Sequence, residues 1–404
     1  MIGVSLKKKK EMSMQCFESY LQPEDVYLPI TREDKILVKT GDLVKEGDIL
    51  GRSMKYDLPI RSSISGRVQI SSDASYIHIQ NNGEEITYTK KKEKKNYTKE
   101  EILSLLKEAG ICGMGGAGFP TYIKYSTKEK INTLIVNAVA CEPYITSDYV
   151  CILKHTNMIL DTISILMQTF AIKECVIAIK AKSPLLKEAL LTRASAYKKI
   201  KVSEVPNLYP MGWERALVRY LKHTDYKNLP IEKGIVVNNV STIYAIAEAI
   251  FYQKPLLDRI VTFSGENMKK PCNVKVKIGT KISTILEKIG VCSKSTLILG
   301  GPMMGRELDL EQDVILPSTT SVLALPSKEI EESPCIRCGK CTENCPSKIS
   351  PILIRENKEN EEVLKHLNPE ACIACGICSY ICPAKILVKE AVQEAKDRMR
   401  GRKK

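Results

Sequence analysis

The chain carries CIRCGKCTENCP at Cys335–Pro346 and CIACGICSYICP at Cys372–Pro383. Both stretches have the spacing Cys-x-x-Cys-x-x-Cys-x-x-x-Cys-Pro, which is typical of bacterial ferredoxins that hold [4Fe–4S] clusters. Three thiolates on a tight loop can reach three corners of one cubane, and Gly339 and Gly376 let the backbone bend around it. The sequence therefore predicts two neighbouring iron–sulfur clusters that carry electrons.

The fourth cysteine of each run is predicted to ligate the cluster of the other run, as in two-cluster ferredoxins. The predicted ligands of cluster one are Cys335, Cys338, Cys341 and Cys382. The predicted ligands of cluster two are Cys372, Cys375, Cys378 and Cys345. Zinc is the alternative, because Cys-x-x-Cys pairs also build four-cysteine zinc sites. Eight cysteines in two quartets, with prolines in register, disfavour zinc.

Composition points to a chain of the reducing cytoplasm. Fifteen cysteines without a signal-peptide pattern favour metal binding over a disulfide framework. No apolar stretch approaches the ~20 residues of a membrane helix. Some of the net charge of +14 lies in the runs Lys7–Lys10, Lys90–Lys95 and Arg398–Lys404. These runs are either solvated loops and tails or a surface attracted to an anionic membrane or acidic partner, whereas nucleic acid is disfavoured because aromatics are not interleaved.

The first ninety or so residues predict a tail at 1–24 and a small β-domain at 25–92. The stretches Val38–Gly51 and Pro59–Ile70 alternate apolar and polar residues around Gly-Asp turns, which predicts short strands and hairpins. They resemble the barrel-sandwich of biotinyl and lipoyl carrier domains. The tip that would carry the lysine reads Ser62-Ser63-Ile64-Ser65-Gly66, so we expect a structural domain without a covalent cofactor.

Strands alternate with helices over 97–255, which predicts an α/β layer with a largely parallel sheet. The pattern Thr98-Lys-Glu-Glu101 predicts a capping box at the start of its first helix, and another helix is expected over about Asn157–Ala171. Short strands and one helix return over 256–325, which indicates a small α+β domain. The cysteine-rich module is expected at 326–390, followed by a basic tail at 391–404.

A glycine loop follows the first of these helices. Gly113-Met-Gly-Gly-Ala-Gly118 matches G-x-G-x-x-G, but it follows a helix and ends at Phe119-Pro120. An ordinary dinucleotide fingerprint should follow a strand and open a helix, so a Rossmann NAD site is not predicted here. Exposed backbone amides in such a loop can bind a phosphate or a flat ring, and a purely structural loop is the alternative.

Several stretches in order carry a family resemblance: GMGGAGFPTYIKY (113–125), NAVACEPYITSDY (137–149), YPMGWE (209–214), VNNVST (237–242), VKVKIGTKIS (274–283), GGPMMG (300–305) and the two cysteine runs. Together they resemble the C subunit of the Rnf ion-translocating electron-transport complex, from about residue 25 to 390. The glycine loop and the Glu142-Pro143 segment also resemble the flavin subunit of respiratory complex I.

The resemblance implies a multidomain α/β and α+β protein. Its expected parts are an N-terminal barrel-sandwich domain, a complex-I-flavin-subunit-like α/β core that binds FMN and meets NAD(H), a soluble-ligand-binding β-grasp domain and a two-cluster ferredoxin-like module. The implied function is that of an oxidoreductase subunit in a translocase, passing electrons between NAD(H), FMN and the clusters. The implied partners are the other Rnf subunits and, through them, ferredoxin. The implied location is the cytoplasmic face of the cell membrane, as a peripheral protein.

The resemblance also implies cofactor-binding residues. Gly115, Gly116 and Gly118 would line the flavin or nicotinamide, and Lys124 would meet the flavin phosphate region. Asn137 and Glu142 would lie near the isoalloxazine ring, with Tyr209, Gly212 and Glu214 on the opposite wall. Asn238, Asn239 and Ser241 would form the phosphate end.

Three positions depart from the family pattern. Ala140 stands where the family has an acidic residue, Trp213 stands where it has glycine, and the usual His-x-Gly-Ala-Pro stretch is missing near Thr31–Ile36. Two alternatives stay open. One is a soluble RnfC-like protein that feeds a partner reductase of the cobalamin or proline type. The other is a relay that has lost flavin and keeps only its clusters and partners.

Overall fold

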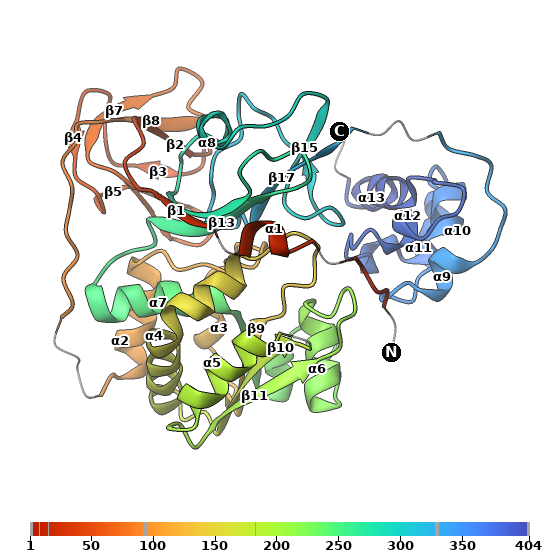
Figure 1. Cartoon of the computed structure of the whole chain (residues 1–404), viewed down its shortest axis with the longest axis horizontal. Helices are drawn as coiled ribbons and strands as arrows, with labels where there is room; N and C mark the ends of the chain where they lie inside the picture. Colours follow the sequence, from red (N-terminus) through yellow and green to blue (C-terminus); the bar gives the residue numbers. More distant parts are fainter. Residues whose placement is uncertain are drawn as a thin grey trace.

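The computed structural model describes residues 3–7, 9–14, 16–91, 96–181, 183–327 and 331–401. Three domains built around β-sheets lie together, and the cysteine-rich module lies to one side of them (Figure 1). The N-terminal segment, residues 3–7 and 9–14, runs between that module and the rest of the molecule.

The barrel-sandwich domain is built from two small sheets. One has the strand order β2-β8-β7-β4, with β2 (Asp25–Pro29), β8 (Tyr76–Asn81), β7 (Gly66–Ile70) and β4 (Leu43–Val44). The other joins β3 (Lys35–Ile36), β5 (Ile49–Arg52) and β6 (Pro59–Arg61). The tip that would carry a cofactor lysine is buried, and Ser63 Oγ donates a hydrogen bond to the Ile278 carbonyl at 2.6 Å. A buried tip supports the expected structural role.

The α/β domain has a four-stranded sheet in the order β11-β10-β9-β12, and every neighbouring pair is parallel, as predicted. The strands are β9 (Thr133–Ala138), β10 (Glu174–Lys180), β11 (Ile200–Val205) and β12 (Ile235–Asn239). The helices are α2 (Lys99–Glu108), α3 (Thr121–Tyr125), α4 (Ser147–Thr169), α5 (Pro184–Ala194), α6 (Glu214–Lys222), the 3-10 turn η1 (Pro230–Lys233) and α7 (Val240–Tyr252). The capping box is confirmed, because Thr98 and Glu101 exchange both backbone-to-side-chain hydrogen bonds at the start of α2.

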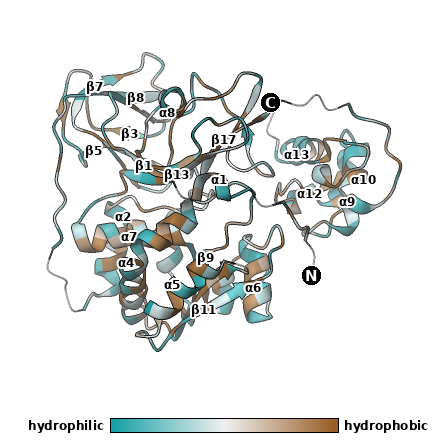
Figure 2. Cartoon of the chain, viewed as in Figure 1, coloured by the Kyte–Doolittle hydropathy of each residue, from teal (hydrophilic) through white to brown (hydrophobic). Residues whose placement is uncertain are grey.

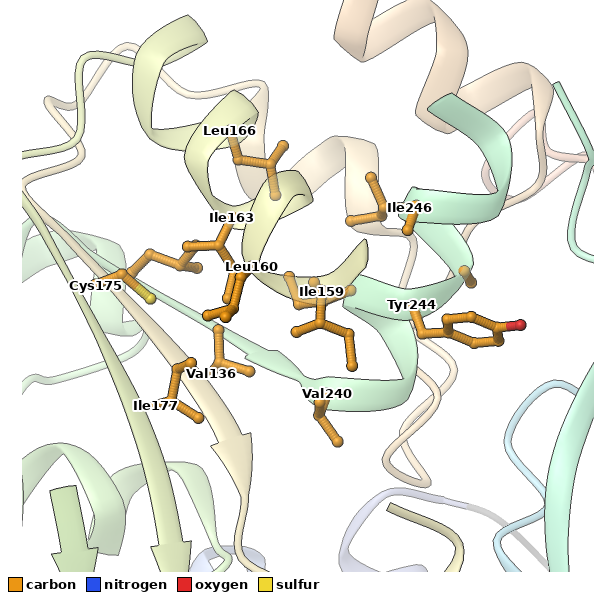
Figure 3. Close-up of a cluster of buried hydrophobic side chains, with 14 of the residues drawn as sticks. Val136, Ile159, Leu160, Ile163, Leu166, Cys175, Ile177, Val240, Tyr244 and Ile246 are labelled. Carbon is orange, nitrogen blue, oxygen red and sulfur yellow. The ribbon is translucent and has the colours of Figure 1, made fainter. Parts of the chain in front are cut away.

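Helix α4 begins at Ser147 rather than near Asn157, because a kink at His155 (φ −127°, ψ 23°) divides it and the sequence pattern revealed only its second half. That half packs Ile159, Leu160 and Ile163 against Val136 and other sheet residues (Figure 3). In length and composition α4 alone among the described helices could cross a membrane, and 56% of its most apolar stretch is buried inside the protein. Brown and teal turns alternate along it in Figure 2, as on a helix with one buried face.

The α+β domain has a six-stranded sheet in the order β1-β14-β13-β17-β15-β16, covered by α8 (Ile282–Ile289). Its strands are β1 (Phe17–Tyr20), β13 (Asp258–Ser264), β14 (Cys272–Lys277), β15 (Ser295–Leu299), β16 (Arg306–Glu307) and β17 (Ser321–Pro326).

The predicted tail at 1–24 is wrong where the structure describes those residues. α1 (Glu11–Met14) is followed by β1, and β1 pairs in parallel with β14. Lys9 forms an ion pair with Glu266 at 2.6 Å, and Lys10 Nζ donates to the Ala140 carbonyl at 2.6 Å. The prediction failed because β1 is short and its partner strand lies far along the chain.

The cysteine-rich module is helical. It comprises α9 (Lys340–Glu343), α10 (Pro351–Glu356), α11 (Glu361–Leu367), the 3-10 turn η2 (Pro369–Ala371), α12 (Ile377–Tyr380) and α13 (Val388–Met399). The predicted basic tail from 391 is wrong as far as residue 399, because α13 continues there and buries Val392 and Ala395 in the module's core. The rest of that prediction, at 402–404, lies outside the described residues.

Candidate redox site

The two cysteine runs have the same backbone. Arg337 and Ala374 have φ of 53° and 55°, and Gly339 and Gly376 follow with φ of 75° and 74°. In each run the amide two residues after the first cysteine donates to that cysteine's sulfur, Arg337 to Cys335 and Ala374 to Cys372, both at 3.4 Å. Amides directed at sulfur stabilise thiolate ligands, so both loops are shaped for cluster binding.

Cys345 of the first run lies among cysteines of the second. It lines one cavity with Cys372, Cys375 and Cys378, together with Cys341. Burial first, and then the neighbouring thiols, Cys345 included, raise the pKa of the Cys378 thiol to about 12. The geometry thus brings together the four predicted ligands of cluster two, in a buried space where only a cation could hold them as thiolates.

The predicted ligands of cluster one are more accessible to solvent. Cys338 is exposed, and Cys335, Cys341 and Cys382 are half-buried. Cys375, the counterpart of Cys338 in the second run, is buried against both the α/β and the α+β domains, which contribute Tyr209 and Met303 respectively. The first run is therefore the outer one and the second is the inner one.

The glycine loop closes on itself above the start of α7. Gly113 N donates to the Phe119 carbonyl at 2.8 Å and Gly118 N to the Gly113 carbonyl at 3.0 Å. A Cβ on Gly115 would lie 3.2 Å from the Asn239 side chain, whereas Gly116 (φ 112°) and Gly118 (φ 63°) face open space. The open backbone at a helix N-terminus fits a phosphate-bearing flavin, because both features favour an anion.

Lys124 reaches the same region from α3. Its Nζ donates to the carbonyl of Val237, in the middle of β12, at 2.9 Å. Burial lowers the pKa of its ammonium group, and Glu214 opposes that shift, so the two predicted site residues interact electrostatically. A half-buried lysine at this point supplies the positive charge that a phosphate requires.

Two residues under the glycine loop, the half-buried Asp148 and the buried Arg259, were not predicted. Asp148, at the start of α4, accepts hydrogen bonds from Asn239 Nδ2 and Ser241 Oγ, each at 2.8 Å. The Arg259 guanidinium donates to the Met114 carbonyl at 3.4 Å and to the Pro317 carbonyl. Burial raises the pKa of Asp148 and lowers that of Arg259 to about 10. The only sequence signal was the position of Asp148, at the end of the conspicuous NAVACEPYITSDY stretch.

The other predicted residues hold neighbouring parts of the chain. Asn239 caps α7 by accepting from Ser241 N at 2.8 Å, and buried Asn238 donates to the Tyr125 hydroxyl at 2.6 Å. Asn137 Nδ2 donates to the Gly212 carbonyl at 2.9 Å. Gly212 has no room for a side chain, because its Cβ would lie 2.7 Å from the Val139 carbonyl oxygen.

Glu142 and Tyr209 face the iron–sulfur module. Both carboxylate oxygens of Glu142 accept backbone hydrogen bonds, from Met303 N and Met304 N, each at 3.0 Å. Burial raises the pKa of this carboxyl group, and the two amides oppose the shift. The Tyr209 hydroxyl donates to the carbonyl of Cys375 at 2.7 Å. Tyr209 therefore contacts the inner cysteine run directly, whereas Glu142 holds the Met303–Met304 turn of the α+β domain, against which Gly376 of that run packs.

A glycine loop at a helix N-terminus, joined to a module with two ferredoxin-type cysteine runs, defines a flavin- and iron–sulfur-binding electron-transfer protein. Three family models agree: the RnfC barrel-sandwich hybrid domain matches residues 1–89, the Nuo51 FMN-binding domain 106–248 and the 4Fe-4S dicluster domain 334–386. The chain belongs to the RnfC family, the C subunits of ion-translocating oxidoreductase (Rnf) complexes, and its cofactors are FMN and two [4Fe–4S] clusters.

Named relatives support this membership. The C subunit of the ion-translocating oxidoreductase complex of Rhodobacter capsulatus is 33% identical over 87% of this chain and 73% of its own length. The corresponding protein of Vibrio cholerae is 33% identical over 84% of this chain but only 47% of its own length. The C subunit of the proton-translocating ferredoxin:NAD(+) oxidoreductase complex of Clostridium ljungdahlii is 30% identical over 82% of this chain and 78% of its own.

A solved structure shares the fold at low sequence identity. The NAD+-reducing [NiFe]-hydrogenase in the H2-reduced state matches with a TM-score of 0.54 and 16% identity, over 75% of this chain and 63% of the hydrogenase chain. At that identity the match supports the fold alone.

Proposed function

We propose that this chain is the peripheral subunit that exchanges electrons with NAD(H) in an Rnf-type complex at the cytoplasmic face of the cell membrane. Its partners in this proposal are the other subunits of the complex, which pass electrons between it and ferredoxin. FMN, when bound, exchanges electron pairs with nicotinamide and single electrons with iron–sulfur clusters.

The contact between Tyr209 and Cys375 is the observation that carries the proposal. The Tyr209 hydroxyl bonds the backbone of a predicted cluster ligand, while the Tyr209–Gly212 turn is held to β9 by Asn137. One short turn thereby fixes the inner cysteine run relative to the domain that the FMN-binding family matches. A fixed separation between two redox centres is what directed electron transfer in one chain requires.

The chain's own residues have separate tasks in this proposal. The glycine loop, Lys124 and the start of α7 would hold the flavin phosphate. Gly212, Glu214 and Trp213 would face the nicotinamide, with the Trp213 ring available for stacking. Arg259 would position the glycine loop through its bond to the Met114 carbonyl, and Asp148 would do so through Asn239, which packs against Gly115.

The test follows the visible spectrum of anaerobic, cluster-replete protein mixed with NADH. Bleaching of the flavin band followed by the cluster band is the expected result. The glycine loop supplies the matched pair of variants. G115V forces a branched side chain against Asn239 and should abolish the response, whereas G83N, at a remote turn (φ 79°) that faces open space and where asparagine tolerates the left-handed backbone, changes a distant surface only. Clusters that dithionite bleaches but NADH leaves unchanged in the parent protein would overturn the proposal.

The cross-ligation of the clusters has a test of its own. The triple variant C335S/C338S/C341S should keep one cluster, near four iron atoms per chain, since it retains the predicted set of cluster two. Adding C345S to it should remove the remaining cluster, whereas adding C382S should not. The opposite pattern, loss with C382S and retention with C345S, would show that each run binds its own cluster.

A soluble RnfC-like protein feeding a partner reductase is the second candidate, and Ala140 and Trp213 favour it. Lys10 Nζ donates to the main-chain carbonyl of Ala140 at 2.6 Å, at the position where the family usually has an acidic residue. The two candidates differ in location. Recovery of the native chain in washed membranes, released only by detergent or high salt, supports the Rnf assignment, whereas recovery in the supernatant with a soluble reductase supports the alternative.

A further inference from the structure

Two cysteines from opposite ends of the sequence lie side by side on the α+β sheet. Cys16 immediately precedes β1 and Cys272 begins β14, and the pairing of Phe17 with Asn273 makes them direct neighbours across the two strands. The Asn273 amide donates to the Cys16 carbonyl at 2.9 Å, which fixes this register. Neither cysteine belongs to the two cluster-binding runs.

Glu18 completes a group of three. It lies two residues after Cys16 on an extended segment, so both side chains project from the same face of the sheet. Cys16 Sγ lies 3.9 Å from Glu18 Oε1, and the two sulfurs and the carboxylate oxygen all lie within 4.8 Å of one another. Ligands bound to one tetrahedral zinc ion through ~2.3 Å Zn–S bonds lie roughly 3.8 Å apart, so the three atoms need only small shifts to bind one ion.

The charge around these thiols is negative. Glu18 raises the pKa of both Cys16 and Cys272, in each case in addition to burial. Burial and Glu18 keep the thiols protonated, and a divalent ion that replaced both thiol protons would stabilise the thiolates beside the carboxylate. Access is available, because Cys272 is buried while Cys16 is half-buried and Glu18 is exposed.

We infer that Cys16, Glu18 and Cys272 form a binding site for one thiophilic divalent cation such as zinc. The three side chains supply two sulfurs and one oxygen, and solvent supplies the fourth ligand. Two thiolates and a carboxylate favour zinc over calcium or magnesium, which prefer all-oxygen sites.

The site lies at the end of the N-terminal segment. Just before it, Asn273 Nδ2 donates to the Ser13 carbonyl at 2.8 Å, and further upstream Val4 forms a β-bridge with Tyr209. A cation at the start of β1 therefore anchors the segment that reaches Ala140 and Tyr209, at the junction with the iron–sulfur module. The role is structural, and it does not depend on the flavin.

Zinc binding by the full, cluster-replete chain tests the inference. Equilibrium dialysis of anaerobic protein against micromolar zinc should give one equivalent above that of C16S, with E18Q at least tenfold weaker. C292S, which removes an exposed cysteine remote in sequence, should bind as the parent does. Iron content and far-ultraviolet circular dichroism of each variant establish that it is folded and that its clusters are in place.

Alkylation supplies a second measurement that needs no variant. Zinc should protect Cys16 from iodoacetamide at least tenfold, as measured by mass spectrometry, while Cys292 in the same chain reacts unchanged. Equal zinc binding by the parent and C16S, a parent that binds no zinc, or a Cys16–Cys272 disulfide in anaerobically isolated protein would overturn the inference.

Discussion

Tyr209 is the residue on which the junction between the domains depends. Its side chain is 1% exposed, and its hydroxyl is the only polar atom on that ring. The resemblance placed Tyr209 in the wall of a flavin site, but its partner could not be predicted, because the Cys375 carbonyl lies 166 positions away in sequence. Because the acceptor is a main-chain carbonyl, which every residue carries, the amino-acid sequence does not indicate which residue accepts this hydrogen bond.

The change Y209F should weaken the attachment of the iron–sulfur module. The ring stays in place, while the Cys375 carbonyl loses its donor, at a cost of about 1–3 kcal/mol for a buried unsatisfied group. Loss of visible cluster absorption in urea under anaerobic conditions should occur at lower denaturant than in the parent. Y380F, on a tyrosine that is 54% exposed on the same module, serves as the control. Identical midpoints for Y209F and Y380F would contradict the role given to the hydroxyl.

Helix α4 illustrates the scale of single elements. The part of α4 after the kink could be predicted from its apolar spacing. The part before it, from Ser147 to Lys154, could not, because the kink at His155 interrupts the helical periodicity and leaves too short a stretch to recognise. At the kink, the His155 ring stacks on Tyr244 with centroids 4.1 Å apart. Burial, with Lys275 next in effect, lowers the pKa of His155 to about 4.

This depressed pKa predicts how stability depends on pH. Below pH 6.5, the ordinary value for histidine, the unfolded chain gains a proton that folded His155 takes up only near pH 4. The free energy of unfolding should therefore fall as the pH decreases from 6.5 towards 4. H155F, which retains the stacked ring but cannot titrate, should show a shallower fall in chemical unfolding series over that range. H366F, on an exposed histidine of α11, should follow the parent, and a parent-like slope for H155F would contradict the prediction.

The elements themselves were largely predictable, and their partners were not. The parallel sheet of the α/β domain follows from alternating strand and helix patterns. The glycine loop was recognised as a candidate site from four glycines in six residues. Asp148 and Arg259 were missed because hydrogen bonds between segments distant in sequence leave no local periodicity. The proximity of Cys16 and Cys272 could not be predicted either, because they lie far apart in sequence and outside the two cysteine runs.

At the scale of the molecule, a buried ion pair joins the barrel-sandwich domain to the α+β sheet. Lys277 of β14 lies 2.6 Å from Glu46, and their side chains are 5% and 6% exposed. Ser63 reaches the same sheet through the Ile278 carbonyl, so the carrier-like tip and the ion pair form one interface. The barrel-sandwich domain, which lacks a carrier lysine, thus packs its tip against the α+β domain.

Breaking that ion pair from one side should be costly. K277M leaves a buried carboxylate and is expected to lower the free energy of unfolding by about 3–5 kcal/mol, whereas E46L/K277M should recover much of the loss. The adjacent pair of Lys45 and Glu84 is 3.6 Å apart with side chains 66% and 45% exposed, so K45M should cost at most about 1 kcal/mol. Urea unfolding measures all three, and a K277M variant no less stable than K45M would contradict the interpretation.

The pairing of β1 with β14 sets an order of events during synthesis. Phe17 cannot pair until Asn273 has been synthesised, roughly 12–50 seconds later at ~5–20 residues per second. The bridge from Val4 to Tyr209 can form earlier, but the Tyr209 bond to Cys375 waits longer still. A nascent chain arrested before residue 273 should therefore expose Phe17–Tyr20 to protease, and this strand should become protected only once β14 has emerged.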